Sequence, residues 1–133
     1  MKSLLLLRPE EVLYRWDELA SLLQRAVDLG RGEVNVDDIR ALVLGGRMFI
    51  FATDAFALTC EFITYPQKTV MVVGFGAGQV GDPAGVLQVL EEFARRGGAS
   101  SIQSYCRKPS MVRYYRKYFD DVAPAYTVLE KKL

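Results

Sequence analysis

Thr69-Val-Met-Val-Val-Gly-Phe-Gly-Ala-Gly-Gln-Val-Gly81 is the stretch that decides the fold of this chain. Residues 70–73 are all apolar, which is typical of a strand covered on both faces. The glycines of residues 74–81 predict a turn, and a helix is expected over residues 82–96. Asp82 suits the N-cap position of that helix because its side chain can accept a bond from a free N–H group. The stretch therefore predicts a buried strand, a glycine turn and a helix in succession.

A strand that passes through a glycine turn into a helix N-terminus is an arrangement that binds anions, most often phosphate. Glycines can turn free backbone N–H groups towards a ligand, and the positive end of the helix dipole lies at the same place. The alternative is a tight turn that needs glycine only for its backbone angles. The local pattern leaves both interpretations open.

The composition predicts one soluble globular domain over residues 1–133. Hydrophobic residues make up 50% of the chain and charged residues 25%, which is a usual balance for a globular protein. A formal net charge of +1 argues against nucleic acid as a partner and against attraction to a membrane. The sequence has no apolar stretch of membrane length, and the run at residues 4–7 is too short for a signal sequence. A cytoplasmic location is therefore expected.

Two residue types narrow the possible chemistry. The chain has no histidine, which removes the commonest general base, the His-dependent nucleophile pairs and most zinc sites, so no metal site is expected. Cys60 and Cys106 lie in strand-like contexts and are expected to be buried thiols in a reducing compartment. Any catalysis must use carboxylates, tyrosines, lysines, backbone groups or a bound cofactor.

Hydrophobic periodicity and turn residues divide the whole chain into helices and strands. Strands are predicted at residues 3–7, 48–53, 56–65, 69–75, 101–106 and 125–133, and helices at residues 10–29, 35–44, 82–96 and 109–119. The order β-α-α-β-β-β-α-β-α-β implies an α/β fold with a mixed central sheet and helices on both faces.

This order of elements resembles the GNAT superfamily of acyl-CoA-dependent N-acetyltransferases over essentially the whole chain. In that family two helices follow the first strand, three antiparallel strands come next, and a pyrophosphate loop joins the fourth strand to a long helix. Many members also carry a Tyr followed four and five positions later by a Gly-Phe pair. The segment Tyr114-Tyr-Arg-Lys-Tyr-Phe119 keeps the Tyr and the Phe, with Tyr118 in place of the glycine.

The resemblance implies that the pyrophosphate loop lies within residues 74–83. The family's loop reads Gln/Arg-x-x-Gly-x-Gly/Ala, and its nearest match is Gln79-Val-Gly-Asp-Pro-Ala84. Asp82 replaces the central glycine, and a carboxylate there would repel a pyrophosphate at a cost of about 1 kcal/mol or more. Pro83 also removes one potential donor. A loop shifted towards the upstream glycines is the alternative.

The resemblance also implies acetyl-CoA as cofactor and an amine-bearing small molecule or protein as acyl acceptor. Backbone groups around residues 72–74 would polarise the thioester carbonyl, Tyr114 would protonate the departing thiolate, and Glu61 would act as base. The alternatives are a Glu61 on a solvated strand face and a Tyr114 that is an ordinary half-buried tyrosine. The cofactor is expected to contact Val72, Val73, Gly74, Gly76, Gly78, Gln79, Gly81 and Ala84.

The marked cationic run of the chain comprises Arg107, Lys108, Arg113, Arg116 and Lys117. Such a run fits a cofactor phosphate, nucleic acid, an acidic protein surface or simply a solvated helix face. The tyrosines between these cations keep base stacking open. Helical spacing, however, places Tyr115 in the core, which weakens the case for nucleic acid.

A second, looser resemblance is to small GNAT-like proteins of tailed phages, including those labelled internal virion protein. It is carried by the helix containing Trp16, by the helix start at residues 35–38 and by the degenerate loop. The leading function is acyl-CoA-dependent N-acyl transfer to an unknown acceptor. The alternative that the phage resemblance implies is a catalytically silent protein that forms part of a virion or binds a host protein, located in the host cytoplasm or the virion.

Overall fold

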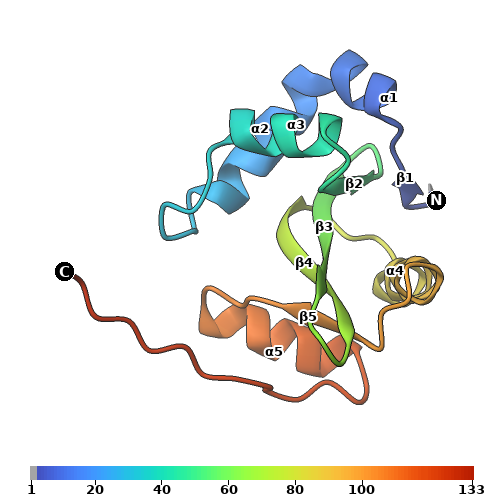
Figure 1. The fold of residues 1–133 in the computed structure, drawn as a ribbon. Helices are drawn as coiled ribbons and strands as arrows, with labels where there is room; N and C mark the ends of the chain where they lie inside the picture. The colour runs from blue at the N-terminus through green and yellow to red at the C-terminus, as the bar shows by residue number, and fades with distance from the viewer. Residues whose placement is uncertain (1–2) are drawn as a thin grey trace.

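Up to its last helix the chain follows the predicted order of helices and strands, except that the first predicted helix is formed as two. The computed structural model describes residues 3–133 (Figure 1). Its elements are β1 (Leu5–Leu6), α1 (Pro9–Tyr14), α2 (Trp16–Val27), α3 (Val36–Leu44), β2 (Phe49–Ala52), β3 (Phe56–Thr64), β4 (Thr69–Gly78), α4 (Pro83–Arg96), β5 (Ser101–Ser104) and α5 (Pro109–Tyr118).

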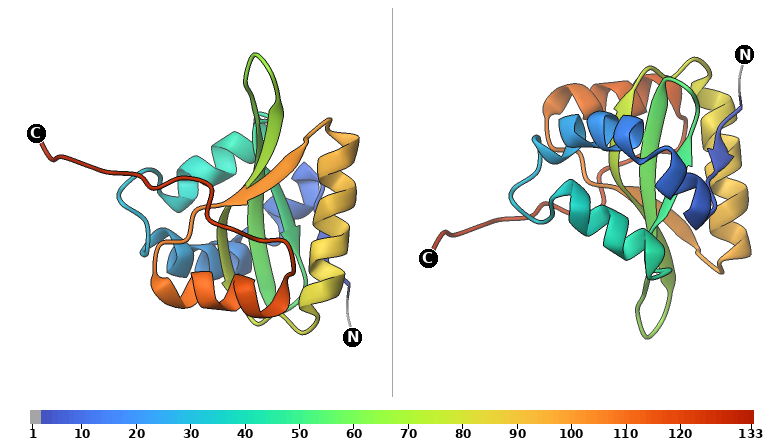
Figure 2. Two further views of the ribbon diagram at one scale, coloured as in Figure 1. Left: turned by 90° about the horizontal axis from the view of Figure 1, so that it is seen from below. Right: turned by 90° about the horizontal axis from the view of Figure 1, so that it is seen from above.

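The strands form one mixed sheet in the order β1-β2-β3-β4-β5. Neighbouring strands from β1 to β4 are antiparallel, whereas β5 runs parallel to β4, with Val70 opposite Ser101 and Val73 opposite Ser104. Figure 2 shows α2 and α3 lying on one face of this sheet and α4 and α5 lying on the other. The predicted α/β class, with a mixed sheet and helices on both faces, is confirmed.

The sheet separates two clusters of buried side chains. One cluster lies under α2 and α3 and includes Leu19, Leu23 and Ile39, all fully buried. The other lies under α4 and includes Met71 and Leu90. Because β4 supplies buried residues to both clusters, the strand at the centre of the sequence prediction is also central in the structure.

The α4 face of the sheet is rich in aromatic rings. Phe93 of α4 lies 5.2 Å from Phe49, 5.1 Å from Phe51 and 5.5 Å from Phe62, measured between ring centroids. Gly97 ends α4 directly over one of these rings, and a Cβ atom at that position would stand 2.3 Å from Cζ of Phe62. The helix therefore packs closely on the sheet partly because residue 97 has no side chain.

The first predicted helix, residues 10–29, is divided in two at Arg15. Arg15 has φ −100° and ψ 14°, and its guanidinium donates a bond of 3.1 Å to the carbonyl oxygen of Thr53. The buried face of α2 consists of Leu19, Leu23 and Ala26. The prediction of one continuous helix over residues 10–29 was therefore only partly correct.

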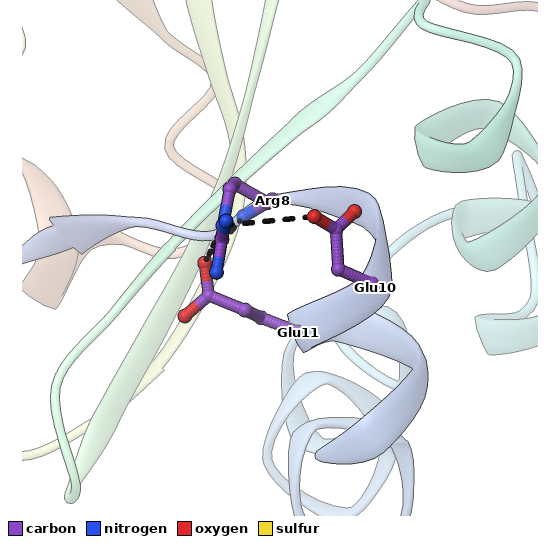
Figure 3. Close-up of polar contacts among 3 residues, drawn as sticks. All are labelled: Arg8, Glu10 and Glu11. Carbon is purple, nitrogen blue, oxygen red and sulfur yellow. Dashed lines mark hydrogen bonds and ion pairs between the residues drawn. The ribbon is translucent and has the colours of Figure 1, made fainter.

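The start of α1 is fixed by contacts between Arg8 and the first turn (Figure 3). The backbone N–H of Arg8 donates to a carboxylate oxygen of Glu11 at 3.1 Å, and its Nε donates to the same oxygen at 3.0 Å. Glu10 lies 3.7 Å from the same guanidinium. The bond from the backbone of Arg8, followed by the side-chain bond, lowers the pKa of the Glu11 carboxyl. The chain therefore enters the helix with two acidic groups in the first turn, where the helix dipole favours them.

The predicted final strand, residues 125–133, is not formed. The described chain after α5 is irregular, and its apolar side chains Val128 and Leu129 are 85% and 90% exposed. An ion pair joins Glu130 of this tail to Arg31. A half-buried strand needs alternating polarity, but it also needs a neighbouring strand to which its backbone can bond. The sequence pattern shows only the alternation, which explains why the prediction was wrong. In the described residues β5 pairs with β4 alone.

In the part of the chain that the structure describes, no helix is long and apolar enough to cross a membrane.

Candidate functional site

The glycine-rich segment is mostly strand and not turn. β4 continues to Gly78, with Gly76 opposite Leu58 and Gly78 opposite Phe56 on β3. Gly78 has φ 112°, and a Cβ atom there would stand 2.0 Å from the carbonyl oxygen of Ala55. Gly78 is therefore explained by its positive φ and its close approach to β3, whereas a Cβ atom at Gly76 would meet only ordinary contacts. The expectation of a turn at Gly76 and Gly78 is wrong because both lie in β4, and their contact with a ligand stays a prediction.

A bulge interrupts the pairing of β3 and β4 at Gly74 and Phe75. The register passes from Cys60 opposite Val73 to Leu58 opposite Gly76, so both bulge residues face Thr59. The N–H of Phe75 donates to the buried hydroxyl of Thr59 at 3.0 Å, which replaces the missing ladder bond. Bulges redirect the backbone and are frequent beside active sites. Sequence reasoning missed Thr59, since a buried threonine in an apolar strand gives no signal of its own.

The parallel strands part at the same place. Pairing between β4 and β5 ends where Val73 meets Ser104, while β4 continues alongside β3. Arg107, just after β5, reaches back across the opening: its Nη1 donates to the carbonyl oxygen of Gly74 at 2.7 Å. Its guanidinium also lies 4.5 Å from the ring centroid of Phe75. One side chain thus bridges the ends of both strands.

Two hydroxyl groups meet beside this opening. The hydroxyl of Tyr115 on α5 lies 2.9 Å from Oγ of Ser104, the residue opposite Val73. Burial raises the pKa of the Tyr115 phenol, and the hydrogen bond with Ser104 opposes that effect. The sequence prediction placed Tyr115 in the core, and it is half-buried with its polar end at the strand ends. Ser104 carried no signal in the sequence.

Tyr114, the predicted proton donor, lies on the outer side of this pair. Its ring packs 4.8 Å from Tyr118 and 6.1 Å from Tyr115, and the residue is 36% exposed. Partial burial, with the neighbouring phenols as smaller causes, raises the pKa of Tyr114. Within residues 3–133 its hydroxyl forms no hydrogen bond. The phenol is thus protonated at neutral pH and free to donate.

Glu61, the predicted base, is on β3 opposite Val72 and is half-buried. In the described part of the chain no hydrogen bond joins its carboxylate to Tyr114 or to another residue. The structure therefore brings Ser104, Tyr115 and Arg107 together at the strand ends, but it does not bring Glu61 and Tyr114 into contact. Val72 is fully buried and can offer a ligand only its backbone, whereas Val73 is half-buried.

In the loop before α4, the side chain of Asp82 bonds to a backbone N–H group at the start of the helix. Oδ1 of Asp82 accepts a bond of 3.1 Å from the N–H of Gly85, and its backbone oxygen accepts one of 3.0 Å from Val86. This confirms the predicted N-cap. The N–H of Gln79 is bonded to the carbonyl oxygen of Ala55 at 2.9 Å, and Pro83 has none. Gly81 and Ala84 remain near the helix mouth, but the carboxylate sits among the donors that a pyrophosphate would need.

A hollow lined by positively charged side chains lies between β5 and α5. It has a volume of about 500 Å³ and is lined by Cys106, Arg107, Lys108, Pro109, Val112 and Arg113. Cys106 is exposed here, so the expectation that it is a buried thiol is wrong. Burial raises the pKa of the Cys106 thiol and Arg107 lowers it. Cys60, in contrast, is buried as predicted, and burial raises its pKa to about 12.

No group of histidine, cysteine, aspartate or glutamate side chains in the described residues has an arrangement suited to a metal ion. The polar groups at the strand ends are hydroxyls, a guanidinium and backbone atoms. Such groups can orient a substrate, donate a proton or hold an anion.

The arrangement of the chain matches solved acetyltransferase structures. An aminoglycoside acetyltransferase from an uncultured soil metagenomic sample, in complex with sisomicin, matches with a TM-score of 0.72 at 11% identity, over 98% of this chain and 95% of that chain. A ribosomal-protein-alanine N-acetyltransferase from Brucella melitensis matches with a TM-score of 0.67 at 15% identity, over 98% of this chain and 99% of that chain. The chain therefore has the GNAT fold.

A protein described as something other than an acetyltransferase has the same fold. A transcriptional regulator from Bacillus halodurans matches with a TM-score of 0.65 at 14% identity, over 98% of this chain and 99% of that chain. No protein-family model matches the sequence, and no curated protein matches it significantly. A fold shared at such identities does not determine a function, so the function must be argued from the site.

Proposed function

We propose that this protein is an acyl-CoA-dependent N-acyltransferase whose reaction takes place where β4 and β5 part. The observation that carries the proposal is the bulge at Gly74 and Phe75, which lies at the end of the parallel pairing, beside the hydroxyls of Ser104 and Tyr115. The fold supports it, since neighbours with this fold include enzymes described as acetyltransferases. The acyl acceptor is an amine on a small molecule or a protein.

The residues present fit an acyl-CoA in one part of the site and not in another. The mouth of α4 does not suit a diphosphate, because the carboxylate of Asp82 is bonded to the N–H of Gly85 there. The end of β5 does suit phosphate, because Arg107, Lys108 and Arg113 line an open hollow. Backbone groups of Val73 and Gly74 stand between these two places, at the opening that would receive the acyl end. Bound there, an acyl-CoA would supply an activated acyl thioester.

The side chains of this protein would accept and donate the protons that the reaction moves. Acyl transfer to an amine requires the amine to be neutral and the departing thiolate to be protonated. Tyr114 is our proton donor, because its raised pKa keeps the phenol protonated and its hydroxyl is free of hydrogen bonds in the described structure. Tyr115 is less suited to that role because Ser104 engages its hydroxyl. It would instead hold the end of β5 in place.

Glu61 would accept the proton of the acceptor amine through water. Its carboxylate is half-buried on β3 and has no ion-pair partner among residues 3–133, so it is available to a bound amine. A positively charged acceptor would also be attracted to it. The separation of Glu61 from Tyr114 agrees with a reaction in which the proton is taken up and delivered at different positions.

Two measurements test the proposal. Isothermal titration with acetyl-CoA determines whether the donor binds, and mass spectrometry of a panel of amines determines whether an acetyl group is transferred. The panel should contain polyamines, aminoglycosides and peptides with free N-termini. A thiol reagent should not be used to follow released coenzyme A, because the exposed Cys106 would react with it as well. Absence of binding at millimolar acetyl-CoA would contradict the proposal.

A second candidate function is a binding protein without catalysis. It is favoured by the same Asp82 contact that closes the mouth of α4 to a diphosphate, and by the bond that Arg107 makes to the carbonyl oxygen of Gly74. Under this proposal the protein uses its surface to bind another protein, as a phage virion component or a host-binding module would. Isothermal titration with acetyl-CoA distinguishes the two candidate functions, because a binding protein without catalysis should release no heat of binding with this ligand.

A further inference from the structure

We infer that the hollow between β5 and α5 is the phosphate-binding site of the protein, with Lys108 and Arg113 as the groups that contact phosphate. Under the proposed function, on which the identity of the ligand rests, these phosphates belong to the acyl donor. The phosphate-binding position would then be displaced from the mouth of α4 to the opposite side of the strand opening.

The hollow adjoins the site of the proposed reaction. Arg107 forms part of its wall and, through the same guanidinium, bonds the carbonyl oxygen of Gly74 at the bulge. A ligand with its phosphates in the hollow therefore lies one side chain away from the opening between β4 and β5. Pro109 and Val112 add apolar surface to the lining, which suits the uncharged parts of a nucleotide.

The cations of the hollow have no carboxylate partners. Elsewhere many arginines are paired with carboxylates within 4 Å, namely Arg8, Arg15, Arg31, Arg40, Arg95 and Arg96. Within residues 3–133 neither Lys108 nor Arg113 has such a partner, and the guanidinium of Arg107 donates to two carbonyl oxygens. The pKa of the nearby Glu33 carboxyl is lowered mainly by the bond from the N–H of Arg31, and Arg107 is a smaller cause. Lys108 and Arg113 thus keep positive charges that no carboxylate within 4 Å compensates in the described residues.

The mouth of α4 and the hollow carry opposite charges. At the mouth of α4 a carboxylate occupies the backbone donors, whereas the hollow presents cationic side chains with N–H groups free for a ligand. Phosphate forms its strongest protein contacts with charged donors such as these. A phosphorylated ligand that reaches this end of the sheet is therefore attracted to the hollow and repelled from the helix mouth.

The test compares two double variants that remove the same charge from the same helix region. Lys108→Gln with Arg113→Gln alters the hollow, and Arg116→Gln with Lys117→Gln alters α5 outside the lining. All four side chains are exposed, so both proteins should melt like the parent. Coenzyme A and inorganic pyrophosphate are titrated into each protein by calorimetry. We expect coenzyme A affinity to fall about tenfold or more in the hollow variant and less than about twofold in the control.

Each other result overturns the inference, the proposed function or both. An equal loss in the control variant would mean that the attraction is a general effect of charge. Unchanged affinity in the hollow variant, together with tighter binding in Asp82→Gly, would place the phosphates at the mouth of α4. If the parent binds pyrophosphate but not coenzyme A, and only the hollow variant loses that binding, the phosphate site stands and the proposed function fails. If neither probe binds the parent, both fail.

Discussion

The guanidinium of Arg107 donates a hydrogen bond of 2.7 Å to the carbonyl oxygen of Gly74. These residues lie on either side of the point where the parallel strands separate, so this contact spans an opening that the sheet's own hydrogen bonds do not close. The same side chain also lies over the ring of Phe75. The bulge and the loop after β5 are thereby held together by one residue.

Arg107→Ala should lower the free energy of unfolding by about 2–3 kcal/mol. A hydrogen bond from a charged donor contributes about 1.5–3 kcal/mol, and the contact with the aromatic ring adds a smaller amount. Urea denaturation measures the loss. Arg116→Ala, an exposed residue on α5, serves as the control and should change stability by less than about 0.5 kcal/mol. Equal losses in both variants would show that the bridge adds nothing.

Asp82→Ala should destabilise the protein by about 1 kcal/mol, because the N–H of Gly85 loses its acceptor at the start of α4. Asp82→Asn keeps an acceptor oxygen and should cost little, so the pair separates the cap from the charge. Thermal melting of the two variants is sufficient to test this. Equal destabilisation would mean that the negative charge near the helix dipole, and not the hydrogen bond, is the stabilising feature.

Val72→Asp should be severely destabilising, by more than about 4 kcal/mol, since a fully buried site would receive an unpaired charge. Val128→Asp makes the same chemical change in the tail, where the side chain is 85% exposed, and should leave the melting temperature unchanged. A large loss at Val128 would indicate that residues 125–133 do pair as a strand in solution.

Tyr114→Phe should slow acyl transfer by about a hundredfold while leaving acetyl-CoA affinity nearly unchanged, because the phenol acts on the departing thiolate. Its raised pKa also predicts that ionisation of this phenol reduces activity at a higher pH than an ordinary tyrosine would. Tyr118→Phe changes a more exposed phenol of the same cluster and is the control. A loss confined to Tyr118 would mean that the two tyrosines have been assigned in the wrong order.

Stability should fall as the pH rises above 9. The Cys60 thiol has a pKa of about 12 in the folded protein against an ordinary value of 9.0, so between these values the unfolded chain releases a proton that the folded chain keeps. The free energy of unfolding should therefore decrease by up to about 1.4 kcal/mol per pH unit in this range. Cys60→Ala should show a shallower decrease in urea titrations at the same pH values. If stability falls equally steeply with pH in the parent and in Cys60→Ala, a group other than Cys60 causes the decrease.

Periodicity was enough to predict the helices and central strands, because burial on one or both faces leaves a regular pattern. The N-cap Asp82 was also recognisable, since its effect is local. The end of β4 was not, because glycine in a strand and glycine in a turn look alike until the neighbouring strand is placed. Gly78 is needed where Ala55 approaches it, and no local pattern records that contact.

The site was harder to predict than the fold, for a related reason. Ser104 and Tyr115 are neighbours only because the end of β5 and α5 meet, and Thr59 matters only because a bulge faces it. Tyr114 and Glu61 were chosen by resemblance and by residue type, and their roles stay predictions. The cationic run was visible in the sequence, but its division into a hollow with Arg113 and an outer surface with Arg116 required the helix to be positioned.

The close approach of Gly97 to Phe62 has a consequence for how this sequence can diverge. Alanine at position 97 requires the ring to swing out of its place among the other aromatic side chains, whereas a smaller residue at position 62 removes the obstacle. The two positions are therefore not free to drift independently. Among descendants of this chain, loss of the ring at position 62 should come first, and only those lineages should later replace the glycine.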